Sequence, residues 1–159
     1  MKIVQCLLIC LLSVQLLSCG SSSGSDPAPT PQPTVSQLVS KSWSVSSVTW
    51  DGVTQYSKGA TSNLVSGYSQ FKLDLTSSTA ASLTEFDGRK FTGTYTLSTD
   101  NKKITLNGLT SSEGAPSGTN GTLEFNIVGT PSASALSLET STTYIKASNK
   151  KVSLALVNP

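Results

Sequence analysis

Apolar and polar residues alternate along most of the chain between about positions 38 and 157. In the run 71–75, Phe71, Leu73 and Leu75 fall on one side of an extended strand, while Lys72 and Asp74 fall on the other. A period of two predicts half-buried strands, and such runs number about eight. The expected strands are 43–50, 68–75, 81–86, 91–98, 103–106, 123–127, 136–144 and 152–156. No stretch shows the period of a long amphipathic helix.

Short turns join most of these strands. Asp87-Gly88 is a strong signal for a tight hairpin turn, because both residues tolerate a positive φ. Sequential strands with short connections favour an antiparallel meander, and closing the meander into a barrel removes its exposed edges. The predicted fold is therefore all-β, an up-and-down barrel of about eight strands, with an open β-sandwich as the alternative.

The first strand carries a phase change. Its apolar positions switch from Trp43 and Val45 to Val48 and Trp50. An extra residue in one strand would produce this switch, so the pattern predicts a bulge or bend near positions 46–47.

Two connections are much longer than the others, 51–67 and 107–121. If strands alternate up and down, both lie at the end of the barrel opposite the chain termini. Loops of this length are usually functional or disordered. The first contains Tyr56 and Leu64 and follows Trp50, which makes it the better candidate for a lid.

The chain begins with the parts of a secretory signal: Lys2, a mainly apolar stretch over 3–17, and the small residue Ser18. The run Leu16-Leu17-Ser18-Cys19 resembles the lipobox of bacterial lipoproteins. The resemblance implies cleavage before Cys19 and acylation of its thiol, so that the protein contacts a membrane through covalent lipid and needs no other cofactor.

The expected organisation has three parts. Residues 1–18 form the signal peptide, residues 19–36 a lipidated cysteine with a flexible Gly/Ser/Pro linker, and residues 37–159 the β-domain. Gly20 is not the aspartate that retains some lipoproteins at the inner membrane. We therefore expect the outer membrane of a bacterial envelope, facing the periplasm by default, with exposure at the cell surface as the alternative.

The positions of the cysteines and the balance of charges exclude two further features, an internal disulfide and a nucleic-acid partner. Cys6 and Cys10 lie in the segment that is removed, so the mature chain holds no second cysteine for a disulfide. Eleven Lys and Arg against nine Asp and Glu give a nearly neutral chain without a basic stripe. This balance argues against a nucleic-acid partner, and we expect a monomer.

Three segments then resemble the lipocalin-like domain of many small bacterial lipoproteins. They are 38–45, with Trp43 at the start of the first strand, Asp51-Gly52, and the Gly-Thr-Tyr strand 91–97. The likeness spans about residues 36–157. It implies a barrel whose interior is filled by side chains or holds one small apolar molecule.

The usual residues of catalysis are missing from the sequence. It has no histidine, no Gly-x-Ser-x-Gly element and no phosphate-binding loop, and its one mature cysteine is expected to carry lipid. No metal site is predicted. Carboxylates are present, but nothing in the sequence brings a pair of them together: Glu85, Asp87, Glu113, Glu124 and Glu139. We therefore predict a protein that is not an enzyme.

Aromatic residues are the remaining candidates for a binding site. Those on apolar strand phases are more typical of core packing, and those around the first long loop could stack on a sugar or cover an apolar ligand. The candidate ligand-binding residues are Trp43, Trp50, Tyr56, Tyr68, Phe71, Tyr95 and Phe125. The predicted function is a lipid-anchored envelope protein that binds a small apolar molecule or serves as a structural or interaction module. The alternative is a stalked carbohydrate- or protein-binding β-sandwich.

Overall fold

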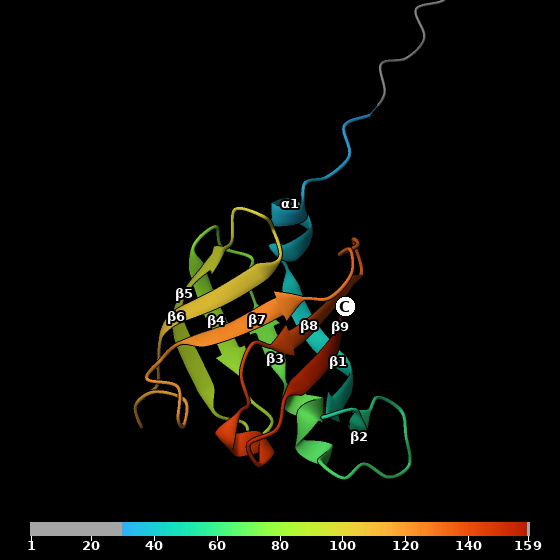
Figure 1. Ribbon diagram of the computed structural model, residues 1–159, viewed down its shortest axis with the longest axis vertical. Helices are drawn as coiled ribbons and strands as arrows, with labels where there is room; N and C mark the ends of the chain where they lie inside the picture. The colour runs from blue at the N-terminus through green and yellow to red at the C-terminus, as the bar shows by residue number, and fades with distance from the viewer. Residues whose placement is uncertain (1–29, 159) are drawn as a thin grey trace, which may run out of the picture. The chain divides into compact units, whose positions relative to one another are not determined.

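The computed structural model describes residues 30–158 (Figure 1). The predicted signal peptide, Cys19 and the linker up to residue 29 lie outside the described residues. A compact unit begins at Gln32, and its first element is the helix α1, Val35–Val39. The folded domain thus begins before position 37, the boundary expected from the sequence.

A capping box starts α1. The Thr34 hydroxyl accepts the backbone N–H of Gln37, and the Gln37 side chain accepts the backbone N–H of Thr34. At the other end of the helix the buried Trp43 donates its indole N–H to the carbonyl of Val39 at 2.8 Å. The helix is therefore fixed to the first strand through the core.

Nine strands and two 3-10 helices follow. They are β1 (Ser42–Trp50), β2 (Val53–Ser57), η1 (Ser66–Gln70), β3 (Lys72–Asp74), β4 (Ala80–Thr84), β5 (Lys90–Leu97), β6 (Lys103–Thr110), β7 (Leu123–Ile127), β8 (Ala135–Thr140), η2 (Ile145–Ala147) and β9 (Val152–Val157). All neighbouring strands are antiparallel.

Strand β1 closes the sheet into a barrel. One of its edges pairs with β9, and its other edge pairs first with β3 and then with β2. The barrel consists of β1 and β3 to β9, and β2 is an extra strand beside it. The predicted eight-stranded antiparallel barrel is confirmed, and the β-sandwich alternative is wrong because the sheet is continuous.

The bulge in β1 is confirmed as well. The pairing of β1 with β9 shifts between Val45 and Ser47, so Ser46 is the extra residue. Val45 and Val48 both point into the core, with exposed fractions of 4% and 0%. The bulge therefore produces the phase change seen in the sequence.

Four expectations about element boundaries are wrong. Strand β6 extends to Thr110, so the expected loop 107–121 begins inside a strand. Residues 68–70 belong to η1 rather than to a strand, because Tyr68 and Phe71 are spaced like one 3-10 turn, and Phe71 donates its N–H to the carbonyl of Tyr68 at 3.1 Å. The expected loop 51–67 contains β2. Strand β8 ends at Thr140, and Tyr144 leads into η2 instead of continuing the strand.

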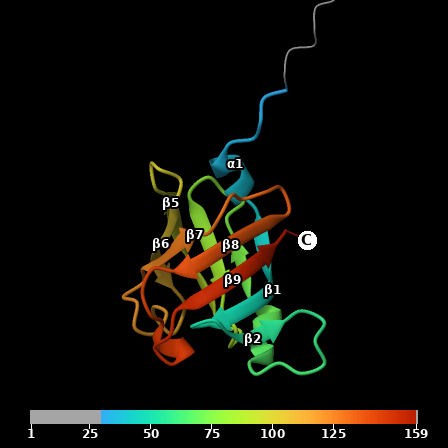
Figure 2. The ribbon, with the colours of Figure 1, turned by 45° about the vertical axis from the view of Figure 1, so that its right-hand side comes forward.

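The two ends of the barrel differ (Figures 1 and 2). Helix α1 and the C-terminal end of β9 lie at one end, where Ser44 pairs with Val157. The other end carries η1, the β4–β5 turn, the long β6–β7 connection and η2. We call this second end the mouth. The predicted placement of both long connections opposite the domain termini is confirmed. No helix within residues 30–158 has the length and apolar character needed to cross a bilayer.

Candidate functional site

The sequence-predicted aromatic residues divide into two groups. Trp43 and Tyr95 lie toward the α1 end. Trp43 has no exposed surface, and the Tyr95 hydroxyl bonds to Ser40 Oγ at 3.0 Å and donates to the carbonyl of Leu75 at 3.3 Å. These contacts join α1 and the strand ends, so both residues hold the fold together at a distance from the mouth.

The second group meets at the mouth. Trp50, Tyr56, Tyr68 and Phe71 pack together with Phe86, which sequence reasoning did not select, and we call these five rings the aromatic cluster. The ring of Tyr68 is the centre of the cluster, 4.8 Å from the ring of Phe86. Trp50 donates its indole N–H to the Tyr68 hydroxyl at 2.9 Å.

Tyr68 is deeply buried, with 2% of its surface exposed. Burial is the main reason that the pKa of Tyr68 rises to about 12, against the opposite influence of the hydrogen bond from Trp50. Tyr56, Tyr68 and Phe71 are buried, and the rings of Trp50 and Phe86 pack against Tyr68 while half-buried. The cluster is therefore a plug and not an open stacking platform.

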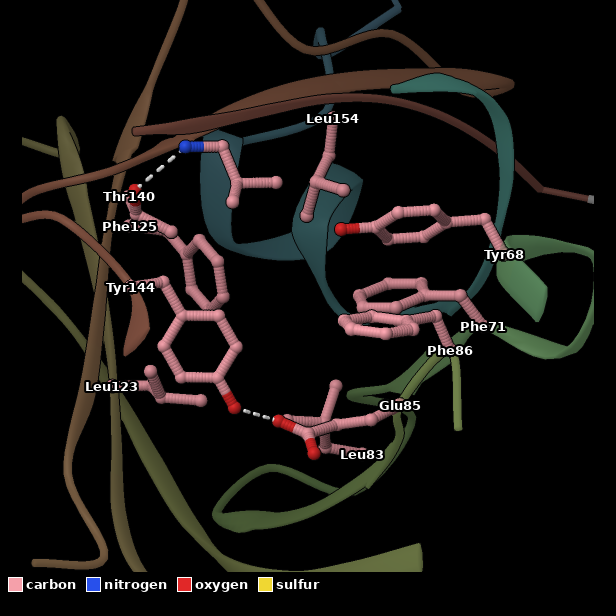
Figure 3. A pocket seen from close by; sticks show the side chains of 11 residues that line it. Tyr68, Phe71, Leu83, Glu85, Phe86, Leu123, Phe125, Thr140, Tyr144 and Leu154 are labelled. Carbon is pink, nitrogen blue, oxygen red and sulfur yellow. Dashed lines mark hydrogen bonds between the residues drawn. The ribbon is translucent and has the colours of Figure 1, made fainter. Parts of the chain in front are cut away.

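A small cavity lies beneath the aromatic cluster (Figure 3). Its volume is about 30 Å³, close to the space of a single water molecule. The cavity is lined by Tyr68, Phe71, Leu83, Glu85, Phe86, Leu123, Phe125, Thr140, Tyr144, Val152 and Leu154. Phe125, the remaining sequence-predicted residue, is thus part of its wall. Ligand pockets usually measure roughly 300 to 1,000 Å³, so the barrel interior is filled.

Four polar side chains close the mouth above this cavity. Glu85, Asp87, Tyr144 and Lys146 form what we call the closing cluster. Tyr144 donates its hydroxyl to Oε1 of Glu85, as Figure 3 shows, and the Lys146 ammonium donates to Oε2 of the same carboxylate. The ammonium also donates to Oδ2 of Asp87 at 2.7 Å.

Glu85 is 3% exposed, which is unusual for a carboxylate. A buried carboxylate is tolerated when charged and hydrogen-bonding partners surround it. The two donors from the η2 segment provide this environment. The closing cluster therefore joins the β4–β5 turn to η2 through groups about 60 residues apart in the sequence.

The tight turn positions both carboxylates. Gly88, with φ 83°, donates its N–H to the Glu85 carbonyl at 2.9 Å, and Glu85 N–H donates to the Arg89 carbonyl. Asp87 Oδ1 accepts the Arg89 backbone N–H at 3.1 Å. The hairpin predicted from Asp87-Gly88 is confirmed, and it places the two carboxylates on either side of the Lys146 ammonium.

The pKa values of the closing cluster follow its charges. Burial alone would lower the pKa of Lys146, but its bonds to Asp87 and Glu85 outweigh burial and raise that pKa. Burial acts to raise the pKa of Asp87, and Lys146 and the Arg89 backbone N–H lower it overall. Burial and the hydrogen bond to Glu85 raise the pKa of Tyr144 well above its ordinary range.

Close backbone contacts reinforce the closure. A Cβ atom on Gly67 of η1 would lie 2.1 Å from the carbonyl oxygen of Phe86, so only glycine permits this approach of η1 to the β4–β5 turn. On the opposite side, a Cβ on Gly118 would lie 2.9 Å from a methyl carbon of Ile145. The mouth is therefore packed shut from both long connections.

A surface groove of about 270 Å³ lies outside the mouth. It shares Leu123, Thr140 and Tyr144 with the inner cavity, so these three side chains separate the two spaces. The exposed hydroxyl groups of Thr142 and Thr143 line the groove.

The closing cluster was not predicted from the sequence. The sequence offers Glu85 and Asp87 as carboxylates without bringing them together, it places Tyr144 at the end of the expected strand 136–144, and it does not single out Lys146. Both carboxylates bind the same lysine, so neither is free to act on a substrate as it stands. Among residues 30–158, no group of histidine, cysteine and acidic side chains is arranged to hold a metal ion.

Comparison of the chain with models of protein families, with curated proteins and with solved structures finds no match.

Proposed function

We propose that the chain is a lipid-anchored bacterial envelope protein whose filled barrel serves as a rigid structural or interaction module. The lipobox-like run ending at Cys19 and the preceding signal sequence support the anchor. The mouth and its long connections lie at the end of the domain opposite α1, where the chain enters. This arrangement suits contacts made away from the membrane.

The small size of the interior cavity supports the proposal that the barrel is a rigid structural or interaction module. About 30 Å³ is far below the roughly 300 Å³ of a small ligand pocket. A barrel that is already filled presents its outer surface and loops, not its interior. The sequence contains no histidine, and the mouth carboxylates are bound to Lys146. Both observations favour a function without catalysis.

Metabolic labelling with a palmitate analogue tests the anchor. We expect the wild-type chain to incorporate the label and the Cys19→Ala variant to lose it. A wild-type chain without label, or a Cys19→Ala variant that keeps it, would contradict the proposal, since Cys19 would then not carry the lipid.

Native mass spectrometry tests the filled interior. The domain from residue 20 onward, exported behind an ordinary cleavable signal peptide and purified from the periplasm of its own host, should carry no small molecule. A stoichiometric apolar compound, retained in repeated preparations, would refute the proposal of a filled structural module. It would favour a second candidate function, which is binding of a small apolar ligand. One observation supports this candidate: the inner cavity is separated from the outer groove by only Leu123, Thr140 and Tyr144.

A further inference from the structure

The lysine of the closing cluster has an unusual environment. Lys146 contacts two carboxylates, and its side chain is 13% exposed. The pairs made by Lys103 with Glu124 and by Lys151 with Glu139 each involve one carboxylate and have exposed fractions between 36% and 47%. Within residues 30–158, no other lysine has two carboxylate partners. An amine that contacts two carboxyl groups and is largely shielded from water can condense with one of them as well as form an ion pair.

Asp87 is the electrophile of this arrangement. Its Oδ2 lies 2.7 Å from the Lys146 ammonium nitrogen, which brings that nitrogen close to the carboxyl carbon. The other oxygen, Oδ1, accepts the backbone N–H of Arg89 at 3.1 Å. A fixed N–H at this oxygen stabilises the negative charge that develops when a nucleophile adds to the carbon. The Arg89 side chain adds positive charge, with Nε 3.9 Å from Oδ2.

Glu85 is the acid-base group. Tyr144 holds Oε1, so Oε2 is left facing the Lys146 nitrogen. A carboxylate at hydrogen-bonding distance from a nucleophile can remove its proton and return it to a leaving group. Glu85 is 3% exposed, and bulk water does not compete for this position.

The surroundings also favour loss of water from the reacting groups. The ring of Phe91 lies 5.7 Å from the Lys146 nitrogen on the inner side, and Tyr144 covers Glu85. Asp87, at 35% exposed, faces the solvent and offers a path by which a released water molecule can leave. Groups held at contact distance react as if at very high concentration, which compensates for a condensation that is unfavourable in open solution.

We propose that Lys146 and Asp87 condense to an isopeptide bond that covalently closes the mouth of the barrel. The ammonium gives the proton of its hydrogen bond to Oδ2 of Asp87, which leaves a neutral amine facing a neutral carboxyl group. The nitrogen then attacks Cγ of Asp87, and Glu85 takes a second proton from that nitrogen and passes it to the leaving Oδ2. The C–N bond forms, the C–Oδ2 bond breaks, and Oδ2 leaves as water. Both hydrogens of this water come from the Lys146 nitrogen, one of them through Glu85. One ammonium and one carboxylate thereby become one amide and one water, with no oxidant or other reactant.

The charged state of the pair controls the rate. The two carboxylates keep the proton on Lys146, so the neutral amine is a minor species and the reaction is slow. The condensation occurs once per molecule and needs no turnover. The mature chain has a single cysteine and therefore no internal disulfide, so an amide cross-link supplies the covalent bond that an extracytoplasmic domain often obtains from cysteine pairs.

Tryptic digestion of the full-length chain, followed by mass spectrometry, tests this proposal. Without the bond, trypsin releases the separate peptides 73–89 and 104–146. With the bond, Lys146 is not cleaved, and peptide 73–89 is joined to peptide 104–150 with the loss of one water. We expect the branched peptide in the wild-type protein. Quantitative recovery of the separate peptides would overturn the proposal and leave the closing cluster as an ion pair only.

Three variants assign the roles. Asp87→Asn should give a branched peptide of the same mass as the wild type, because the side-chain amide loses ammonia where the acid loses water. Glu85→Gln should give separate peptides, and a branched peptide from it would refute the acid-base role of Glu85. Glu124→Gln, which alters an exposed pair in the same peptide, should leave the branch intact. Circular dichroism of each variant establishes that the barrel has folded.

Discussion

Replacing Tyr144 by phenylalanine removes one hydroxyl and leaves the ring. In the wild type this hydroxyl donates to the buried Glu85 carboxylate. A hydrogen bond to a charged group contributes about 1.5 to 3 kcal/mol, and more is lost when the charged partner stays buried. The ring of Tyr144 keeps its place in the cavity wall, so no cavity term is added. We therefore expect the Tyr144→Phe variant to be destabilised by about 2 kcal/mol.

Urea denaturation followed by tryptophan fluorescence measures this loss. With an m-value of about 2 kcal/mol per molar, the midpoint should fall by about 1 M. Tyr56→Phe is the matched control: Tyr56 is buried in the same mouth, and its hydroxyl has no side-chain partner among residues 30–158. Its midpoint should stay within about 0.3 M of wild type. Mass spectrometry of tryptic digests checks that the fraction of Lys146 bonded to Asp87 is the same in the samples that are compared. If both variants shift equally, the hydroxyl of Tyr144 does not stabilise Glu85, and the account of the closing cluster is wrong.

Three further predictions address the same end of the barrel. Gly67→Ala should lower stability by about 1 to 3 kcal/mol in thermal unfolding, since the new methyl meets the Phe86 carbonyl; an unchanged melting temperature would argue against tight closure. Between pH 10 and 12 the wild type should lose about 2 kcal/mol more stability than Tyr68→Phe, because Tyr68 keeps its proton in the folded state up to about pH 12 and an unfolded tyrosine loses it near pH 10; equal losses would refute the burial of Tyr68 as the cause. The Asn63 side chain bonds the N–H and C=O of Ser57 on the outer edge of β2, and Asn63→Ala frees both groups for pairing with another chain. Light scattering should therefore detect concentration-dependent association of this variant, and a variant that stays monomeric would refute the protection of the edge by Asn63.

The period-two pattern predicted most of the barrel because each strand buries one face. It failed at β2, where Gln55 and Tyr56 are adjacent in sequence and both buried. The reason is a bulge: Tyr56 pairs with Val48 and Thr54 with Thr49, so Gln55 is the extra residue. A bulge in a five-residue strand removes the alternation by which the strand would be recognised.

The closing cluster could not be predicted for a different reason. Its two halves lie on a hairpin turn and a short 3-10 helix, and their approach depends on how the whole barrel closes. Local sequence determines only that Glu85 and Asp87 flank a turn. The sequence does contain a weak signal after Lys146, because serine and asparagine are common in turns. In the structure Ser148 and Asn149 adopt φ of 56° and 60° where η2 ends. Reading that pair as a helix end would have separated residues 144–147 from strand β8.

The bonding of β1 has a mechanical consequence. Force from the N-terminal side enters the barrel through α1 and β1, while a partner at the mouth would hold the opposite end. Such a load runs along β1, which is bonded on one side to β9 and on the other to β3 and β2. Its hydrogen bonds lie across the direction of the load and share it in shear, whereas a strand pulled from its edge loses them one after another. The domain is therefore built to transmit tension along its length while keeping its shape.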